Sequence, residues 1–269
     1  MATSFTTPAL VLRRWKAGES ALMVRFLTPG NGLLNASVGG AQKPTGSLHF
    51  LGNPFTLAQI EVLPTRGTPK VIQGSPLGTF HGIQDRLPAL QAAALVVEAA
   101  ERSSTEGLAN PALFVLTLET LQHFTEAADA ELDVPLLRFA WLLLDGLGAA
   151  PVLERCIRTG GTDAGAYVVP LVNEGGFACA DAARGFPAQA RLPVEVLHLL
   201  HDLSGQLHES EGLPDLAACD PQLQRMALAV LLHFLQATLH EQLKTAEPYL
   251  AGSAPLVLER VAGDLTESA

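Results

Sequence analysis

The densest cluster of basic side chains in the sequence surrounds a tryptophan near the N-terminus. Arg13, Arg14 and Lys16 flank Trp15. Lysine and arginine neutralise the phosphates of nucleic acids, and an aromatic ring on which a base stacks contributes about 1 to 3 kcal/mol per base. The cluster predicts a contact with nucleic acid, but it is also typical of a solvated strand end whose tryptophan lies in a hydrophobic core.

A second group that could do chemistry is a pair of cysteines in the glycine-rich segment 151–190. Cys156 and Cys179 stand where the two halves of a zinc ribbon or treble clef would each begin. Each half normally supplies a second ligand across a tight turn, so that both sulfurs face one tetrahedral centre. Thr159 and Ala182 occupy those second positions, and neither is an ordinary zinc ligand.

Two thiolates do not close a structural zinc site, because such a site needs four ligands. Asp181 or the distant Cys219 could complete it only through a rearranged turn. We therefore expect no stoichiometric zinc and no other cofactor, with the segment held by packing of Phe177, Val168 and Tyr167 on the helices. Bound zinc is the alternative, since three donors and a water can also hold the ion.

Three histidines lie on one face of a predicted helix and could in principle ligate a metal: His198, His201 and His208. Hydrogen-bonded or solvated histidines are the commoner outcome. The sequence has no P-loop, dinucleotide fingerprint, nucleophile elbow or zincin motif. We therefore expect neither an NTPase nor a dehydrogenase, and a hydrolase that uses these histidines is kept as a competing class.

The charge of the chain is divided unevenly along its length. The chain of 269 residues has a net charge of −10, which by itself disfavours a nucleic-acid partner. Residues 1–84, however, hold seven basic and two acidic side chains, a net charge of +5, and the remainder carries −15. This asymmetry predicts a basic part that faces nucleic acid and an acidic part with other work.

The hydrophobic period changes where the charge changes. Residues 1–84 contain five alternating or β-branched segments, which predict strands at 9–14, 22–27, 33–38, 55–63 and 70–73. Five short strands without a long helix favour a small closed barrel of the OB or SH3 type, and the OB fold is a common platform for single-stranded nucleic acid.

After Pro88 the period is helical. It predicts helices over 90–102, 110–128, 136–144, 193–208 and 220–246. The chain is thus expected to be an α+β multidomain protein with an OB-fold barrel at 1–84, a helical domain at 85–150 and 191–250, a small zinc-knuckle-like insertion at 151–190, and a loose tail at 251–269.

No run of residues is apolar enough for a membrane span, and the N-terminal charges do not follow the order of a signal peptide. Three cysteines are too few for a disulfide framework, which agrees with a reducing compartment. We expect a cytoplasmic protein with no membrane partner.

An ordered set of short elements, rather than any one motif, runs along most of the chain. In chain order they are Ala9 to Arg13, Gly18-Glu19-Ser20, Phe26 to Thr28, Gly32, Gly40-Ala41, Lys43, Ser47, Leu51, Pro54-Phe55, Gly148, Cys156, Gly160, Gly175-Gly176 and Cys179. With this ordered set the sequence resembles the RecO family of bacterial recombination mediators.

The resemblance implies an N-terminal OB fold, a helical domain and a zinc-type insertion. It also implies a nucleoid-associated mediator of DNA repair and homologous recombination that is not an enzyme, binds single- and double-stranded DNA and anneals complementary strands. RecR, single-stranded DNA-binding protein and, in some members, RecF would be partners, and RecA loading would be helped indirectly. Two departures are Gln42, where the family usually has a basic residue, and the replaced second cysteines at Thr159 and Ala182.

The sequence and the resemblance agree on DNA binding by the basic module. The expected contacts are Arg13, Arg14, Trp15, Lys16, Arg25, Lys43, Arg66 and Lys70. The competing interpretation is a protein- or RNA-binding OB scaffold without annealing activity, whose acidic helices mediate assembly.

Overall fold

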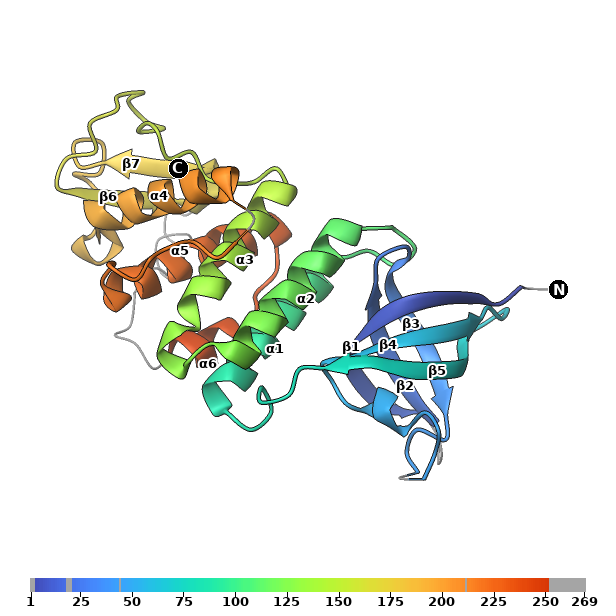
Figure 1. Ribbon diagram of the computed structural model, residues 1–269. Helices are drawn as coiled ribbons and strands as arrows, with labels where there is room; N and C mark the ends of the chain where they lie inside the picture. Colours follow the sequence, from blue (N-terminus) through green and yellow to red (C-terminus); the bar gives the residue numbers. More distant parts are fainter. Residues whose placement is uncertain (1–2, 18–20, 44, 211, 252–269) are drawn as a thin grey trace. The chain divides into compact units, whose positions relative to one another are not determined.

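The computed structural model describes residues 3–17, 21–43, 45–210 and 212–251 (Figure 1). The chain divides into two compact units, residues 1–126 and residues 127–269. The predicted domain boundaries at 84, 150 and 190 stay predictions. The predicted tail, apart from Ala251, lies outside the described residues.

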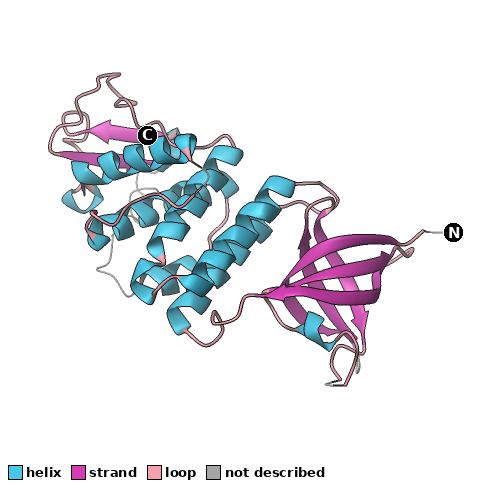
Figure 2. Ribbon diagram, in the orientation of Figure 1, coloured by secondary structure: helices cyan, strands magenta, loops and turns pink. Residues whose placement is uncertain are grey.

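The first unit contains a closed five-stranded barrel (Figure 2). Its strands run in the order β1-β2-β3-β5-β4, and β4 pairs with β1 to close the barrel. All pairs are antiparallel except β3 with β5. The strands are β1 (Phe5–Ala17), β2 (Ala21–Thr28), β3 (Gly32–Gly39), β4 (Thr56–Leu63) and β5 (Lys70–Thr79), and the 3-10 helix η1 (His49–Gly52) comes between β3 and β4. This arrangement confirms the prediction of an OB-like barrel followed by helices.

The barrel forms because every second residue of its central strands is apolar and faces the interior. The buried interior includes Leu22, Val24 and Phe26 of β2, Leu34, Ala36 and Val38 of β3, and Ala58, Ile60 and Val62 of β4. The residues between them face outward, so the outer surface is where this barrel can carry charge and bind a ligand.

Two helices complete the first unit: α1 (Leu87–Arg102) and α2 (Pro111–Glu126). Strand β1 contacts α1 and strand β2 contacts α2, which accounts for the complete burial of Leu10 and Leu27 on the outer side of the barrel. The loop between the helices abuts the β2–β3 turn. A Cβ on Gly32, whose φ is +58°, would lie 2.3 Å from the Thr105 carbonyl oxygen, so this close approach requires glycine.

The second unit is helical, with α3 (Asp133–Gly146), α4 (Val194–Glu209), α5 (Pro221–Leu239) and the short α6 (Ala246–Leu250). Asp220 caps α5 by accepting a hydrogen bond from the Gln222 amide at 2.8 Å. The prediction that this helix runs to residue 246 is wrong. It ends at Leu239 because His240 takes a left-handed conformation, with φ of 52°, and its amide caps the last turn.

An ion pair and a hydrogen bond connect three helices of this unit. Asp133 at the start of α3 pairs with Arg225 of α5 at 2.5 Å, and it accepts a hydrogen bond from the Tyr249 hydroxyl of α6 at 2.6 Å. Burial raises the pKa of Tyr249, and the neighbouring Asp133 carboxylate raises it further. The phenol therefore keeps its proton and remains the donor in this contact.

The insertion between α3 and α4 forms a small antiparallel sheet in the order β7-β6-β8. Its strands are β6 (Tyr167–Leu171), β7 (Gly176–Cys179) and β8 (Leu192–Pro193), and the unit also has the 3-10 helices η2 (Asp129–Glu131), η3 (Val172–Glu174) and η4 (Ala188–Ala190). Gly176 lies so close to Val152 and Ile157 that a Cβ would be 2.5 Å from the Ile157 Cγ2 atom. No helix in the part of the chain that the structure describes is long and apolar enough to cross a membrane.

Candidate nucleic-acid interface

The register of the barrel brings several predicted contact residues into two rows on its outer face. In the first row Arg13 of β1 lies opposite Arg25 of β2, which lies opposite Asn35 of β3. In the second row Trp15 lies opposite Met23. That row continues through Ser37 of β3 to Lys70, the first residue of β5. The two rows place two arginines, a lysine and an aromatic ring on one surface.

A β-bulge decides which residues of the basic cluster share this surface. The register between β1 and β2 shifts between Val11 and Arg13, and a bulge adds one residue to one strand. Beyond it, Arg14 lies opposite Val24 and Lys16 opposite Leu22. Both partners face the barrel interior.

Arg13 and Trp15 therefore lie on one face of the β1–β2 hairpin, while Arg14 and Lys16 lie on the other. All four side chains are exposed to solvent. Trp15 is 40% exposed, so the interpretation that places its ring in the core is wrong. The Arg13 guanidinium lies 5.6 Å from the centre of the Trp15 ring, which holds the ring beside a positive charge.

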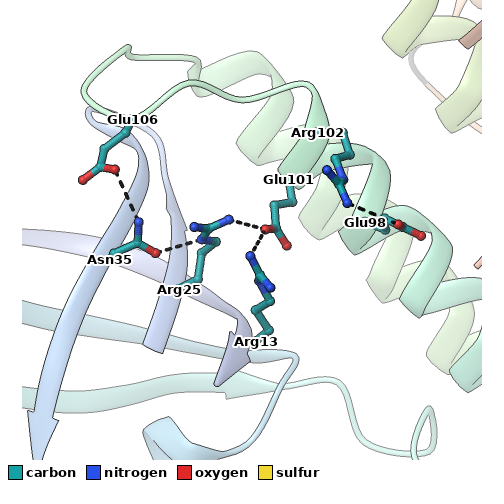
Figure 3. Close-up of polar contacts among 7 residues, drawn as sticks. All are labelled: Arg13, Arg25, Asn35, Glu98, Glu101, Arg102 and Glu106. Atoms are coloured by element: carbon teal, nitrogen blue, oxygen red, sulfur yellow. Dashed lines mark hydrogen bonds and ion pairs between the residues drawn. The ribbon is translucent and has the colours of Figure 1, made fainter. Parts of the chain in front are cut away.

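Glu101 near the end of α1 lies between the two arginines of the first row (Figure 3). Its Oε1 atom accepts a hydrogen bond from Arg25, and Arg13 Nη2 lies 2.8 Å from the same oxygen. Arg25 also donates from Nε to the Asn35 side chain at 2.8 Å, and Asn35 donates to Glu106 at 3.3 Å. The first row is thus a connected polar network that joins three strands to the end of α1 and the loop after it.

The remaining predicted contacts come from loops and from one strand end. Lys43 is exposed in the turn after β3, and the neighbouring Gln42 donates a hydrogen bond to the Ala21 carbonyl at 2.7 Å. Arg66 is exposed in the β4–β5 turn, which is held to β3 by a 2.8 Å hydrogen bond from the Ser37 amide to the Pro69 carbonyl. In OB folds the face of strands 2 and 3 and the loops after strands 1 and 4 bind oligonucleotides. Arg66 lies in the loop after β4, and Lys70 is the last residue of the second row.

Sequence reasoning missed Glu101 and Asn35. Glu101 belongs to a predicted helix about 80 residues away along the chain, and only the packing of α1 on β1 brings it to the arginines. The alternation of β3 does place Asn35 outward, and this was the available signal. A single outward asparagine is common, however, so the signal is weak.

The cysteine pair lies in the insertion without a third ligand beside it. The Cys156 Sγ atom accepts a hydrogen bond from the Cys179 amide at 3.2 Å, and the Thr159 hydroxyl lies 3.8 Å from the Cys179 sulfur. In the described part of the chain, no group of three or more His, Cys, Asp or Glu side chains could hold a metal ion. These donors do not fit a closed zinc site, and the absence of zinc stays a prediction.

Hydrogen bonds to the Cys156 sulfur lower the pKa of its thiol. Burial acts to raise the pKa of this thiol, but hydrogen bonds from the Cys179 amide and from Thr159 outweigh burial, and the pKa falls from its ordinary 9.0 to about 6. Phe177 of β7 packs on Phe234 of α5, with ring centres 5.7 Å apart, as predicted. Tyr167 instead packs against the insertion's own cluster around Val169.

The three histidines of α4 are exposed to solvent: His198, His201 and His208. They belong to none of the polar contacts described above. The ligand and hydrolase interpretations thus gain no support from their surroundings.

Two family models match the chain and together cover nearly all of it. The model described as "Recombination protein O N terminal" matches residues 1–80, and "Recombination protein O C terminal" matches residues 84–247. The chain belongs to the RecO family.

Similar proteins named "DNA repair protein RecO" extend this finding. The protein of Roseiflexus sp. (strain RS-1) is 28% identical over 262 residues, which cover 93% of this chain and 91% of that protein. That of Alkaliphilus metalliredigens (strain QYMF) is 30% identical over 173 residues, 64% of this chain and 70% of that protein. That of Bacillus pumilus (strain SAFR-032) is 26% identical over 191 residues, 71% and 73% of the two chains. The similarity to RecO proteins therefore spans both units.

Proposed function

We propose that this RecO-family protein is a DNA repair and homologous recombination mediator that binds single- and double-stranded DNA and anneals complementary strands. The observation that carries the proposal is the outer barrel face, where Arg13 and Arg25 lie in one row and Trp15 and Lys70 in the next. Guanidinium and ammonium groups bind phosphates, and the exposed indole offers a surface for a base.

Strand annealing requires two chains of like charge to approach each other. A basic surface lowers their repulsion, and stacking on an exposed ring keeps bases turned away from the phosphates. The chain has no nucleotide-binding loop. Annealing should therefore proceed without ATP, and the protein's role is to hold strands rather than to break or form covalent bonds.

Membership in the family supports RecR, single-stranded DNA-binding protein and, indirectly, RecA as further partners, with RecF as another candidate. These partners would place the protein at the bacterial nucleoid, in the cytoplasm. Their contact residues are left unassigned, because no motif in the acidic second unit marks them.

A protein- or RNA-binding scaffold is the second candidate. Ile72 and Leu77 of β5 are 45% and 55% exposed, and β5 pairs with β3 only at Lys70 and Val71. An apolar strand whose pairing to one neighbour ends early is a surface to which another chain can add.

Fluorescence anisotropy of the full chain with a labelled single strand, its duplex and the matching RNA separates these functions. If three to five phosphates are contacted, log K against log salt should have a slope of about −2 to −4 on the single strand. Affinity that does not depend on salt would contradict the proposal, and binding to RNA alone would favour the scaffold.

A second assay tests annealing directly. Complementary oligonucleotides coated with single-stranded DNA-binding protein should pair faster in the presence of this protein and without ATP. An unchanged pairing rate, or a requirement for ATP, would contradict annealing.

A further inference from the structure

The first row of the barrel face contains an unusual pair of like charges. Arg13 and Arg25 are directly opposite each other on neighbouring antiparallel strands, an arrangement that is destabilising unless a counter-charge is present. Glu101 supplies that charge, and both guanidinium groups contact the same carboxylate oxygen, Oε1. Two arginines that converge on one anionic oxygen also form the geometry in which proteins bind a phosphate.

We propose that Arg13 and Arg25 form a phosphate subsite of the nucleic-acid interface, that Glu101 occupies it in the free protein, and that a backbone phosphate displaces Glu101 on binding. This inference rests on the proposed function, because it requires the outer barrel face to bind nucleic acid. It adds a residue from α1 that competes with the ligand rather than contacting it.

Burial differs among the three side chains in the way that such an exchange requires. The Arg13 side chain is 54% exposed, so a phosphate can reach it from solvent, whereas Glu101 and Arg25 are 14% and 22% exposed. An ion pair with an exposed partner contributes less to stability, because water solvates the exposed charge when the pair separates. Separating Arg13 from Glu101 is therefore inexpensive.

Arg25 keeps its orientation when Glu101 leaves. Its Nε atom donates to the Asn35 side-chain oxygen at 2.8 Å, and the Asn35 amide donates to Glu106 at 3.3 Å. These contacts orient the guanidinium toward the subsite independently of Glu101 (Figure 3). The phosphate would thus contact Arg25, which is already oriented, and Arg13, which is exposed to solvent.

The exchange has a measurable consequence for salt dependence. An arginine already neutralised by a carboxylate contributes less to counterion release, so the native protein should bind more weakly and with a shallower salt slope than its basic residues suggest. Removing the carboxylate should restore one or two full phosphate contacts, each worth about −0.7 in slope on a single strand.

The test compares Glu101→Gln with Glu98→Gln in the full chain. Glu98 is a matched control because it lies almost one helical turn earlier on α1, its side chain is 15% exposed, and it pairs with Arg102 at 4.0 Å. The probe is a labelled oligothymidylate of about 20 nucleotides, long enough for one barrel, and binding is measured by anisotropy over a salt series.

Glu101→Gln should tighten binding about three- to tenfold at low salt and make the slope more negative by about 0.7 to 1.4. Glu98→Gln should stay within about twofold of the native chain, since its charge is off the row and is paired with Arg102. Arg13→Gln should weaken binding more in the Glu101→Gln background than in the native chain, because in the native chain the lost phosphate contact is partly offset by a Glu101 contact that no longer has to be broken.

The outcomes separate the two proposals. If the native chain does not bind the oligonucleotide, the proposed function fails and the inference fails with it. If the native chain binds but Glu101→Gln equals Glu98→Gln or binds more weakly, only the phosphate subsite is overturned. Should Glu101→Gln fail to fold, Glu101→Asp keeps the charge with a shorter reach, and an affinity equal to that of the native chain would overturn the proposal.

Discussion

The outer barrel face and the insertion each bring two chemically active side chains together, but they complete the pair in opposite ways. On the barrel, Arg13 and Arg25 share an oxygen of Glu101, a group that another anion can replace. In the insertion, Cys156 and Cys179 have no such third group among the described residues, and they are contacted by an amide hydrogen bond and the Thr159 hydroxyl. We expect the first arrangement to exchange a ligand and the second to support the local fold. Substitutions in the barrel row should therefore change binding, and substitutions in the insertion should change stability.

Phe177→Ala should have the largest effect. The Phe177 side chain is buried and its ring packs on Phe234 of α5, so truncation leaves a cavity that costs about 3 to 5 kcal/mol. Urea unfolding of the full chain should show this loss in the transition of the second unit. Arg184→Ala, at a side chain that is 79% exposed, is the control and should stay within about 0.5 kcal/mol. A loss below about 1 kcal/mol for Phe177→Ala would mean that packing does not hold the insertion.

We expect Trp15→Ala to weaken single-strand binding by about 1 to 2 kcal/mol, the contribution proposed for a base that stacks on the exposed ring. Its effect on a duplex should be smaller, because paired bases are not available for stacking. Anisotropy with both probes measures the difference.

The double variant Arg14→Glu with Lys16→Glu tests the opposite face of the same hairpin. It should weaken binding several-fold through charge alone, equally for single strand and duplex. If Trp15→Ala left the affinity unchanged and the double variant lost binding to single strands alone, the binding surface would be the face of Arg14 and Lys16 instead.

The barrel in this comparison could be predicted from the sequence, because apolar residues alternate along its strands. Alternation in β2 and β3 predicts the barrel, because Leu22, Val24 and Phe26 cannot all face solvent. Alternation along a strand already separates Arg13 and Trp15 from Arg14 and Lys16. The bulge before Arg13 leaves no mark in composition, however, so it was not predictable which of the two pairs lies on the outer face. The contacts of Glu101 with the two arginines could not be predicted either, since they depend on how α1 packs on β1.

The insertion shows the other limit of the sequence. The missing second cysteines predict that no ordinary zinc site forms, but they do not say which groups contact the two sulfurs. In the structure these groups are a backbone amide and Thr159. Neither contact could be predicted from the sequence, because the amide of any residue could donate a hydrogen bond to a sulfur.

The hydrogen bonds at Cys156 predict that the stability of the chain depends on pH. The pKa of this thiol is about 6 in the folded chain and 9.0 in the absence of such contacts. Between these values the unfolded state binds more protons, so the free energy of unfolding should rise with pH from about 6 to about 9. Below about pH 6 both states are protonated and the contribution is lost.

Urea unfolding over this pH range measures the effect as the difference between the native chain and Cys156→Ser. Cys219→Ser removes a thiol outside the insertion and is the control. A difference between native chain and Cys156→Ser that stays constant from pH 6 to 9 would contradict a thiolate at this position.

The smallest effect is expected from metal removal. Two thiols with hydrogen-bonded sulfurs leave no tetrahedral donor set, so dialysis against a chelator should leave the melting temperature unchanged, and elemental analysis should find less than one zinc per chain. Structural zinc can contribute on the order of 10 kcal/mol to a small module, which makes the two cases easy to separate. Thr159→Cys sharpens the test because position 159 is already beside the Cys179 sulfur, at 3.8 Å in the native chain. That variant should retain more zinc than the native chain, and its stability should become sensitive to the chelator. A native chain that keeps one zinc after the dialysis would contradict this prediction and show that a tightly bound metal ion completes the insertion.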